Sequence, residues 1–231
     1  MPVPDLRWEV EGRVAALTFD RPDARVNLLT VEVVLALGEI LDEVAARVEA
    51  GDVGAVLVRS AKPGVFIAGA DLDELASVET PAQATAVAAE GQRIFNRLGV
   101  LGVPSLAAIH GTCVGGGLEL ALACDYRIAA DDRGIQMGLP EVRLGLLPGF
   151  GGTTRLPRRI GLSRALDLIL SGRTVAPREA HRLGLLHAVV PAENFETWAR
   201  RYADALARGE RPLPRPRKAP LVLRLLDGSP P

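Results

Sequence analysis

Residues 105–119 of the chain read SLAAIHGTCVGGGLE, and most of the fold prediction starts from this stretch. The apolar run at 105–109 is typical of a buried strand, and residues 115–123 have the composition of a short helix. Three successive glycines, 115–117, stand between the two. Because glycine loses much conformational freedom on folding, such a run is expected where a ligand must approach the backbone.

The start of this helix also predicts the kind of ligand. The first N–H groups of a helix have no partner within the helix, and they lie at the positive end of its dipole. They suit an anion, or an oxygen that becomes anionic during a reaction. The glycines are followed by Leu118, Glu119 and Leu120, which is neither the GxGxxG of a dinucleotide site nor a P-loop.

Outward from this stretch, short apolar strands alternate with helical patterns, which indicates an α/β class built on buried, largely parallel strands. The expected strands are a hairpin over 6–19 and segments at 54–58, 65–70, 105–109, 126–130 and 186–190. The expected helices are 30–50, 81–98, 115–123, 163–170, 177–183 and 192–208. A proline-rich basic stretch follows at 211–218, so we predict a core over 1–191 and a C-terminal segment over 192–231.

Composition excludes several classes of protein. The chain has 231 residues, 48% of them hydrophobic, and its 27 basic and 28 acidic residues give a net charge of -1. This balance excludes general disorder and gives no field that would attract nucleic acid or an anionic membrane. Two cysteines form no metal-ligand pattern, and no apolar run reaches the roughly 18 residues of a membrane span. We expect a soluble, cytoplasmic protein without a metal.

Two carboxylates are candidates for acid–base chemistry. Glu119 stands among apolar residues, and Glu141 follows 22 positions later in a loop rich in glycine and proline. One strand and its turns can bring the second acid beside the first, where the pair could act on one water molecule. The alternatives are a water-facing Glu119 in the first helical turn, and an ion pair of Glu141 with Arg143 or Arg155.

A third segment, 66–71, reads FIAGAD and predicts a small-residue turn with exposed backbone N–H groups, in which Asp71 caps the next helix. Taken alone, it could be no more than a tight turn. The three histidines, His110, His181 and His187, are scattered along the chain, and we interpret them as structural.

Together these segments resemble the enoyl-CoA hydratase/isomerase (crotonase) superfamily. The resemblance rests on residues 66–71, 107–121 and 139–157 and covers the chain from about residue 6 to 205. Within the superfamily, the likeness is greatest to the N-terminal hydratase region of the multifunctional α-subunits of fatty-acid oxidation complexes. It implies a spiral of repeated ββα units with a C-terminal helical segment that is truncated here.

The resemblance also implies roles for seven positions. They are Ala70 and Gly116 as backbone donors to the thioester oxygen, Glu119 as the base toward water, Glu141 as the acid toward the α-carbon, Gly149 near the catalytic water, and Ala68 and Asp71 along the coenzyme A path. The implied reaction adds water across the 2,3 double bond of 2-enoyl-CoA in β-oxidation. A Δ3-Δ2-enoyl-CoA isomerase activity is expected beside it, with no cofactor apart from the coenzyme A of the substrate.

The family also implies assembly, as a homotrimer, a dimer of trimers or part of a larger fatty-acid oxidation complex. Two other functions stay open at this point. One is a catalytically silent protein of the same fold that binds CoA thioesters or acts as a scaffold. The other is an RNA-binding member, which only the basic residues from Arg208 to Lys218 favour.

Overall fold

The computed structural model describes residues 4–210 and begins with the predicted hairpin. Strands β1 (Leu6–Glu11) and β2 (Val14–Phe19) pair in antiparallel register around a turn at Gly12, whose φ is +61°. All residues of β2 are buried, whereas in β1 only Leu6 is buried and the other residues are half-buried or exposed. This difference is expected when β1 is the edge of a sheet and β2 lies inside it.

The strands form two sheets. The remaining strands are β3 (Ala55–Ser60), β4 (Val65–Ile67), β5 (Ser105–Ile109), β6 (Thr112–Val114), β7 (Tyr126–Ala130), β8 (Met137–Gly138), β9 (Thr174–Val175) and β10 (Ala188–Val190). One sheet has the order β1-β2-β3-β5-β7-β10, and the other β4-β6-β8-β9. All pairs are parallel except β1 with β2 and β8 with β9.

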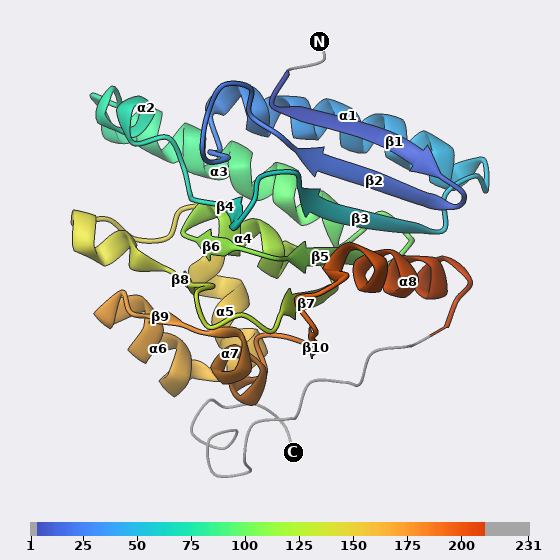
Figure 1. Ribbon diagram of the computed structural model, residues 1–231. Helices are drawn as coiled ribbons and strands as arrows, with labels where there is room; N and C mark the ends of the chain where they lie inside the picture. The colour runs from blue at the N-terminus through green and yellow to red at the C-terminus, as the bar shows by residue number, and fades with distance from the viewer. Residues whose placement is uncertain (1–3, 211–231) are drawn as a thin grey trace.

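The chain alternates between the two sheets in a repeating manner (Figure 1). Strands β3, β5 and β7 enter the larger sheet, and each is followed within a few residues by β4, β6 or β8 of the smaller one. A helical segment then leads to the next turn of the spiral. The predicted α/β class and the ββα repeat are therefore confirmed.

Helices complete each turn. They are α1 (Val31–Glu49), α2 (Leu72–Ala76), α3 (Pro81–Leu98), α4 (Gly116–Ala123), α5 (Gly152–Ile160), α6 (Leu162–Ser171), α7 (Pro177–Leu183) and α8 (Phe195–Ala207), with a 3-10 helix η1 (Pro140–Leu144). The Thr30 side chain caps α1 by accepting from the N–H of Val33, and Thr80 and Gln83 form a capping box at the start of α3.

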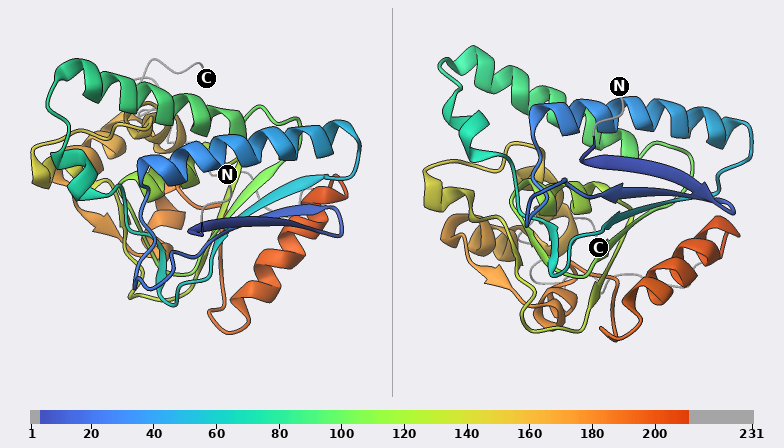
Figure 2. Two further views of the ribbon diagram at one scale, coloured as in Figure 1. Left: turned by 90° about the horizontal axis from the view of Figure 1, so that it is seen from above. Right: turned by 45° about the horizontal axis from the view of Figure 1, so that its top comes forward.

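The helices lie on both faces of the larger sheet (Figures 1 and 2). Helices α1 and α3 run side by side on one face, and α8 crosses the other, where it packs against β3 and β2. Within residues 4–210, none of the helices combines the length and the apolarity needed to cross a bilayer. The domain boundary predicted between 191 and 192 stays a prediction, and residues 211–218 of the basic stretch lie outside the described part.

Several elements were not predicted. Strands β6, β8 and β9 have only two or three residues each, too few to show a period of two. Helix α5 has a glycine at its start and Pro157 inside it, which conceals its pattern. The last helix begins at Phe195 rather than 192, because Asn194 adopts a left-handed conformation with a φ of +60°.

Candidate active site

The glycine run before α4 lets the helix pack against the neighbouring strand. Gly115 has a φ of +54°, which glycine adopts at little cost. At Gly117, an added Cβ would lie 2.4 Å from the backbone oxygen of Ile67 in β4. Glycine is therefore required here by the close approach of two backbones as well as by access to a ligand.

Glu119 is held inside this helix rather than facing water. All eight residues of α4 are buried, and Glu119 is only 2% exposed, so the water-facing alternative is wrong. Its Oε1 accepts hydrogen bonds from the N–H groups of Phe150, at 2.8 Å, and Gly152, at 2.7 Å. Burial raises the pKa of Glu119 to about 7, although the two backbone hydrogen bonds act against this rise.

Glu141 lies on η1 and lines the same cleft as Glu119. The two carboxylates repel each other enough to contribute to the raised pKa of Glu119. Burial likewise raises the pKa of Glu141, and its Oε2 is buried without a hydrogen-bond partner in the described part of the chain.

The alternative ion pair of Glu141 is wrong for the described residues. Arg155 uses its guanidinium elsewhere, since Nη1 donates to the Phe150 oxygen at 2.6 Å and Nη2 to Oδ1 of Asn96 at 2.5 Å. No ion pair joins Glu141 to Arg143 between residues 4 and 210 either. One oxygen of the Glu141 carboxyl group is thus free to meet a ligand in the cleft.

The two backbone donors expected from the sequence face the same cleft. Ala70 lies opposite Leu29 in a parallel bridge: the Leu29 N–H donates to the Gly69 oxygen, and the Asp71 N–H donates to the Leu29 oxygen. The N–H of Ala70 takes no part in this bridge, because it points to the other side of the segment. The N–H of Gly116 belongs to the first turn of α4. An added Cβ on Gly116 would lie 3.6 Å from the Ala70 nitrogen, which makes the two amides neighbours.

The turn around Ala70 is supported by Asn27, a residue that the sequence analysis missed. Asn27 is 1% exposed, and its Nδ2 lies within hydrogen-bond distance of the Phe19 oxygen, the Ser60 hydroxyl and the Phe66 oxygen. Its backbone oxygen accepts from the N–H of Ala68 at 2.9 Å. The sequence does contain a signal for this residue: Asn27 is the polar member of an otherwise apolar run at 26–29, and a buried polar side chain is expected to be hydrogen-bonded.

The other expected site residues also line the cleft. Ala68, Asp71 and Gly149 are all found in its wall. Asp71 is the N-cap of α2, as predicted, and its Oδ1 accepts from the N–H of Asp73 at 3.0 Å. The structure therefore brings all seven positions together around one space, while their individual roles stay predictions.

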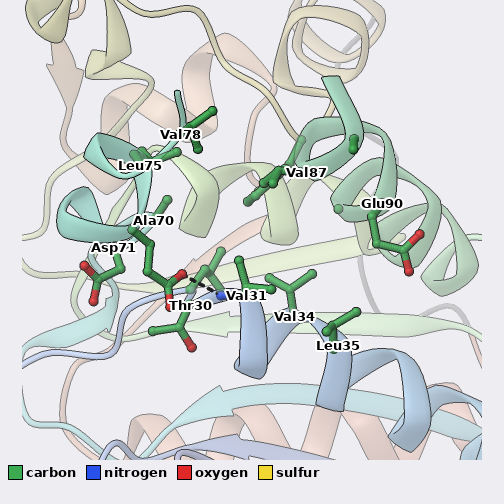
Figure 3. A pocket seen from close by; sticks show the side chains of 15 residues that line it. Thr30, Val31, Val34, Leu35, Ala70, Asp71, Leu75, Val78, Val87 and Glu90 are labelled. Atoms are coloured by element: carbon green, nitrogen blue, oxygen red, sulfur yellow. Dashed lines mark hydrogen bonds between the residues drawn. The ribbon is translucent and has the colours of Figure 1, made fainter. Parts of the chain in front are cut away.

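A second, apolar pocket adjoins the cleft between α1, α2 and α3 (Figure 3). Its cavity volume is about 220 Å³. The two spaces share the wall residues Ala70, Asp71, Leu75, Val78, Val87 and Phe150. At its edge, Oε2 of Glu74 accepts from the N–H of Val31 at 2.7 Å and ties α2 to the start of α1. This pocket was not predicted, because its lining comes from three helices that are separate in sequence.

The histidines lie away from this cleft. His187 is buried, and its Nδ1 accepts from the N–H of Arg127 at 3.1 Å. Burial, with the nearby charge of Arg127, lowers the pKa of His187 to about 3. Among residues 4–210, no three His, Cys, Asp or Glu side chains are grouped in a way that could hold a metal ion.

Comparison with known proteins places this geometry in a family. Residues 9–218 match the family model described as enoyl-CoA hydratase/isomerase. The fatty acid oxidation complex subunit alpha of Shewanella amazonensis is 43% identical over 217 residues, which cover 94% of this chain and 30% of that protein. The corresponding subunit of Aliivibrio fischeri is 46% identical over 181 residues, 78% of this chain and 26% of that protein.

A solved structure agrees with the sequence relatives. The enoyl-CoA hydratase from Bacillus anthracis superposes with a TM-score of 0.80 at 34% identity, over 88% of this chain and 76% of that chain. The chain spans less than a third of the length of the two curated relatives named above. The matched range 9–218 spans the whole cleft described above, and the chain belongs to the enoyl-CoA hydratase/isomerase family.

Proposed function

We propose that the protein is an enoyl-CoA hydratase that adds water across the 2,3 double bond of 2-enoyl-CoA thioesters in fatty-acid β-oxidation. The observation that carries the proposal is the shared cleft, in which Glu119 and Glu141 lie with the backbone amides of Ala70 and Gly116. The family and the curated relatives named for fatty acid oxidation support the same reaction.

The chemistry requires both features. When water attacks the β-carbon, negative charge develops at the α-carbon and spreads to the thioester oxygen as an enolate. The N–H groups of Ala70 and Gly116 would stabilise that oxygen, and the loss of one such donor typically costs about 2.7–4 kcal/mol of transition-state stabilisation. A side chain at position 116 would crowd Leu29, since an added Cβ would lie 3.0 Å from its side chain.

The two acids divide the proton transfers. Glu119, fixed by two N–H donors, would take a proton from the attacking water. Glu141, whose raised pKa favours the protonated form, would supply the proton to the α-carbon. Gly149, the position expected near the water, lines the same cleft. The adjoining apolar pocket is suited to the hydrocarbon tail of the acyl group.

A double-bond isomerase activity is the second candidate. Moving a double bond from the 3 to the 2 position requires one acid to remove a proton and return it to another carbon of the same enolate. Glu141 suits this role because its Oε2 has no partner in the described chain. Ala68 and Asp71, which also line the cleft, would lie along the coenzyme A portion in either reaction.

The deciding experiment pairs a hydratase assay with a binding titration. We expect crotonyl-CoA to be hydrated by the parent protein and not by the double variant Glu119→Gln/Glu141→Gln, while both bind a CoA thioester within a few-fold. A parent protein that binds the thioester without hydrating it would favour the silent binding or scaffold alternative. A parallel assay with a 3-enoyl-CoA measures the isomerase activity.

We also propose that the chain assembles through α6, as a homotrimer or within a larger complex. Leu162, Leu166 and Leu170 follow one another at helical spacing and are 43%, 43% and 62% exposed. Such an apolar stripe on a surface helix is typical of a protein interface. Light scattering should show an oligomer, and a monomer at all concentrations would contradict this proposal.

A further inference from the structure

The turn formed by residues 149–152 supplies both N–H groups that bind Glu119. The carbonyl oxygens of Gly149, Phe150 and Gly151 in this turn are also hydrogen-bonded, each by a different donor group. Gln92 donates to the Gly149 oxygen at 2.7 Å, and Arg155 donates through Nη1 to the Phe150 oxygen at 2.6 Å. The Gly151 oxygen accepts from the backbone N–H groups of Thr154, at 3.1 Å, and Arg155, at 2.9 Å, in α5. The turn is therefore fixed on the side that faces away from Glu119.

The Gln92 bond acts on the same peptide group that serves Glu119. In a trans peptide the C=O and the N–H point in opposite directions, so the Gly149 oxygen and the Phe150 N–H belong to one rigid plane. Gln92 holds one end of this plane and Oε1 of Glu119 accepts from the other. A hydrogen bond to the carbonyl also polarises the group and strengthens its N–H as a donor.

Arg155 supports the middle of the turn. Its guanidinium lies against Gly151, where an added Cβ would approach Nη1 to 2.3 Å, and its Nη2 reaches Asn96 on α3. Gly151 itself has a φ of +104°, a conformation that favours glycine, so the arginine packs against the part of the turn that requires glycine. Arg155 thus connects α5, through the Phe150 oxygen of the turn, to Asn96 on α3.

Helix α3 is the common support of these contacts. It carries Gln92 and Asn96, and the ring of Phe95 packs edge-on against Phe150, with 5.4 Å between ring centroids. The preceding turns of the same helix, around Val87, line both the cleft and the apolar pocket. The helix that borders the pocket is therefore the one that holds the turn beside the catalytic acid.

We propose that Gln92 and Arg155 are positioning residues, which act through the turn 149–152 to set the orientation of the Glu119 carboxylate and the strength of the two hydrogen bonds that it accepts. Neither side chain is among the seven positions expected from the sequence, and neither needs to touch the substrate. The kinetic part of this inference rests on the proposed hydratase function.

Gln92 offers the cleaner test, because its side chain is exposed and its loss removes no core packing. We expect Gln92→Leu to lower kcat for crotonyl-CoA about fivefold, with KM within twofold of the parent value, since one neutral hydrogen bond is lost. The matched control is Arg93→Leu, the next residue on α3, whose side chain pairs with Glu90 instead of the turn. It should retain the parent kcat.

The pH dependence separates positioning from general destabilisation. The charged groups facing Glu119 are Glu141 from η1 and Arg155 from α5, and Gln92→Leu leaves both in place. Weaker N–H donors stabilise the ionised carboxylate less, so the acidic limb of the kcat/KM profile should move to higher pH. A merely structural role would lower the active fraction and leave the limb where it is.

A direct titration of Glu119 in the unliganded protein makes the inference independent of turnover. With carboxyl-labelled glutamate followed by NMR, and Glu119→Gln used to assign the signal, we expect the midpoint to rise in Gln92→Leu and not in Arg93→Leu. If the parent protein fails to hydrate crotonyl-CoA but this shift occurs, the proposed function is wrong and the positioning role stands. If the parent is active and Gln92→Leu changes neither the midpoint nor kcat, the positioning role is wrong.

Discussion

Helix α4, which carries Glu119, is buried over its whole length, whereas no residue of η1, which carries Glu141, is fully buried. The first carboxylate accepts two backbone hydrogen bonds on one oxygen, while the second has an oxygen without a partner in the described chain. The two carboxylates are thus held by different kinds of structure, one by a buried helix and the other by a short helix at the surface. In the proposed reaction, the acid that takes a proton from water is fixed by core packing, and the acid that protonates the α-carbon lies on a short surface helix.

The strongest test of this contrast is the loss of charge at the fixed position. Glu119→Gln keeps the acceptor oxygen for Phe150 and Gly152 but removes the base. General acid–base catalysis contributes about 10²–10⁴-fold, and we expect a loss of kcat toward the upper end, about 10³-fold or more. Thioester affinity should change little. Single-turnover rates with crotonyl-CoA, beside a binding titration, provide the measurement, and a rate near that of the parent would disprove the paired-acid mechanism.

The same substitution should stabilise the protein at high pH. Glu119 has a pKa of about 7 in the folded protein, against an ordinary value of 4.5 for a glutamate side chain. Between these values the folded protein holds a proton that the unfolded chain has released, so the free energy of unfolding falls as the pH rises. The cost reaches about 3 kcal/mol above pH 7.

Denaturant unfolding at pH 5 and pH 8 measures how the free energy of unfolding depends on the protonation of Glu119. Glu119→Gln carries no such cost, so its stability relative to the parent should increase from pH 5 to pH 8. Other titrating groups, such as His187 with its lowered pKa, act equally in both proteins. Parallel pH profiles for the two proteins would contradict the burial argument.

Removing the charge on the exposed support should have a smaller effect. Glu141 is only partly buried, and glutamine resembles the protonated form that its raised pKa favours. We expect Glu141→Gln to lower kcat about 10²-fold, because the proton donor is lost, and to change the free energy of unfolding very little. If this variant were destabilised as strongly as a core substitution, the distinction between the two supports would fail.

The smallest predicted effect concerns the end of η1. Gly145 has a φ of +72° with no heavy atom within 4 Å of an added Cβ, so Gly145→Ala should cost about 1 kcal/mol through backbone strain alone. The matched control is Gly102→Ala, with a φ of +81° and equally open surroundings. Both should lower Tm alike, and only Gly145→Ala should lower kcat. Equal kcat values would show that the conformation of η1 does not matter for Glu141.

The sequence alone predicted the α/β class and the central positions because each has a local signal. The glycines at 115–117, the apolar strand before them and the caps Thr30 and Asp71 are all visible in short windows. The support of Glu119 is different, since its two donors come from 31 and 33 positions further along the chain. No short window contains such a contact, and the apolar pocket between three helices has the same origin.

Asn27 joins segments that are far apart in the sequence, and this has a consequence for any shortened form of the protein. Its side chain contacts the ends of β2 and β3 and the Phe66 oxygen of β4, and its backbone holds Ala68. A shortened chain that began after Asn27, made by internal translation initiation or by proteolysis, would still contain Glu119, Glu141 and Gly116. It would keep the pairing of Leu29 with Ala70 but would lack the Asn27 contacts to Phe66 and Ala68, so the segment that presents the Ala70 N–H would have less support.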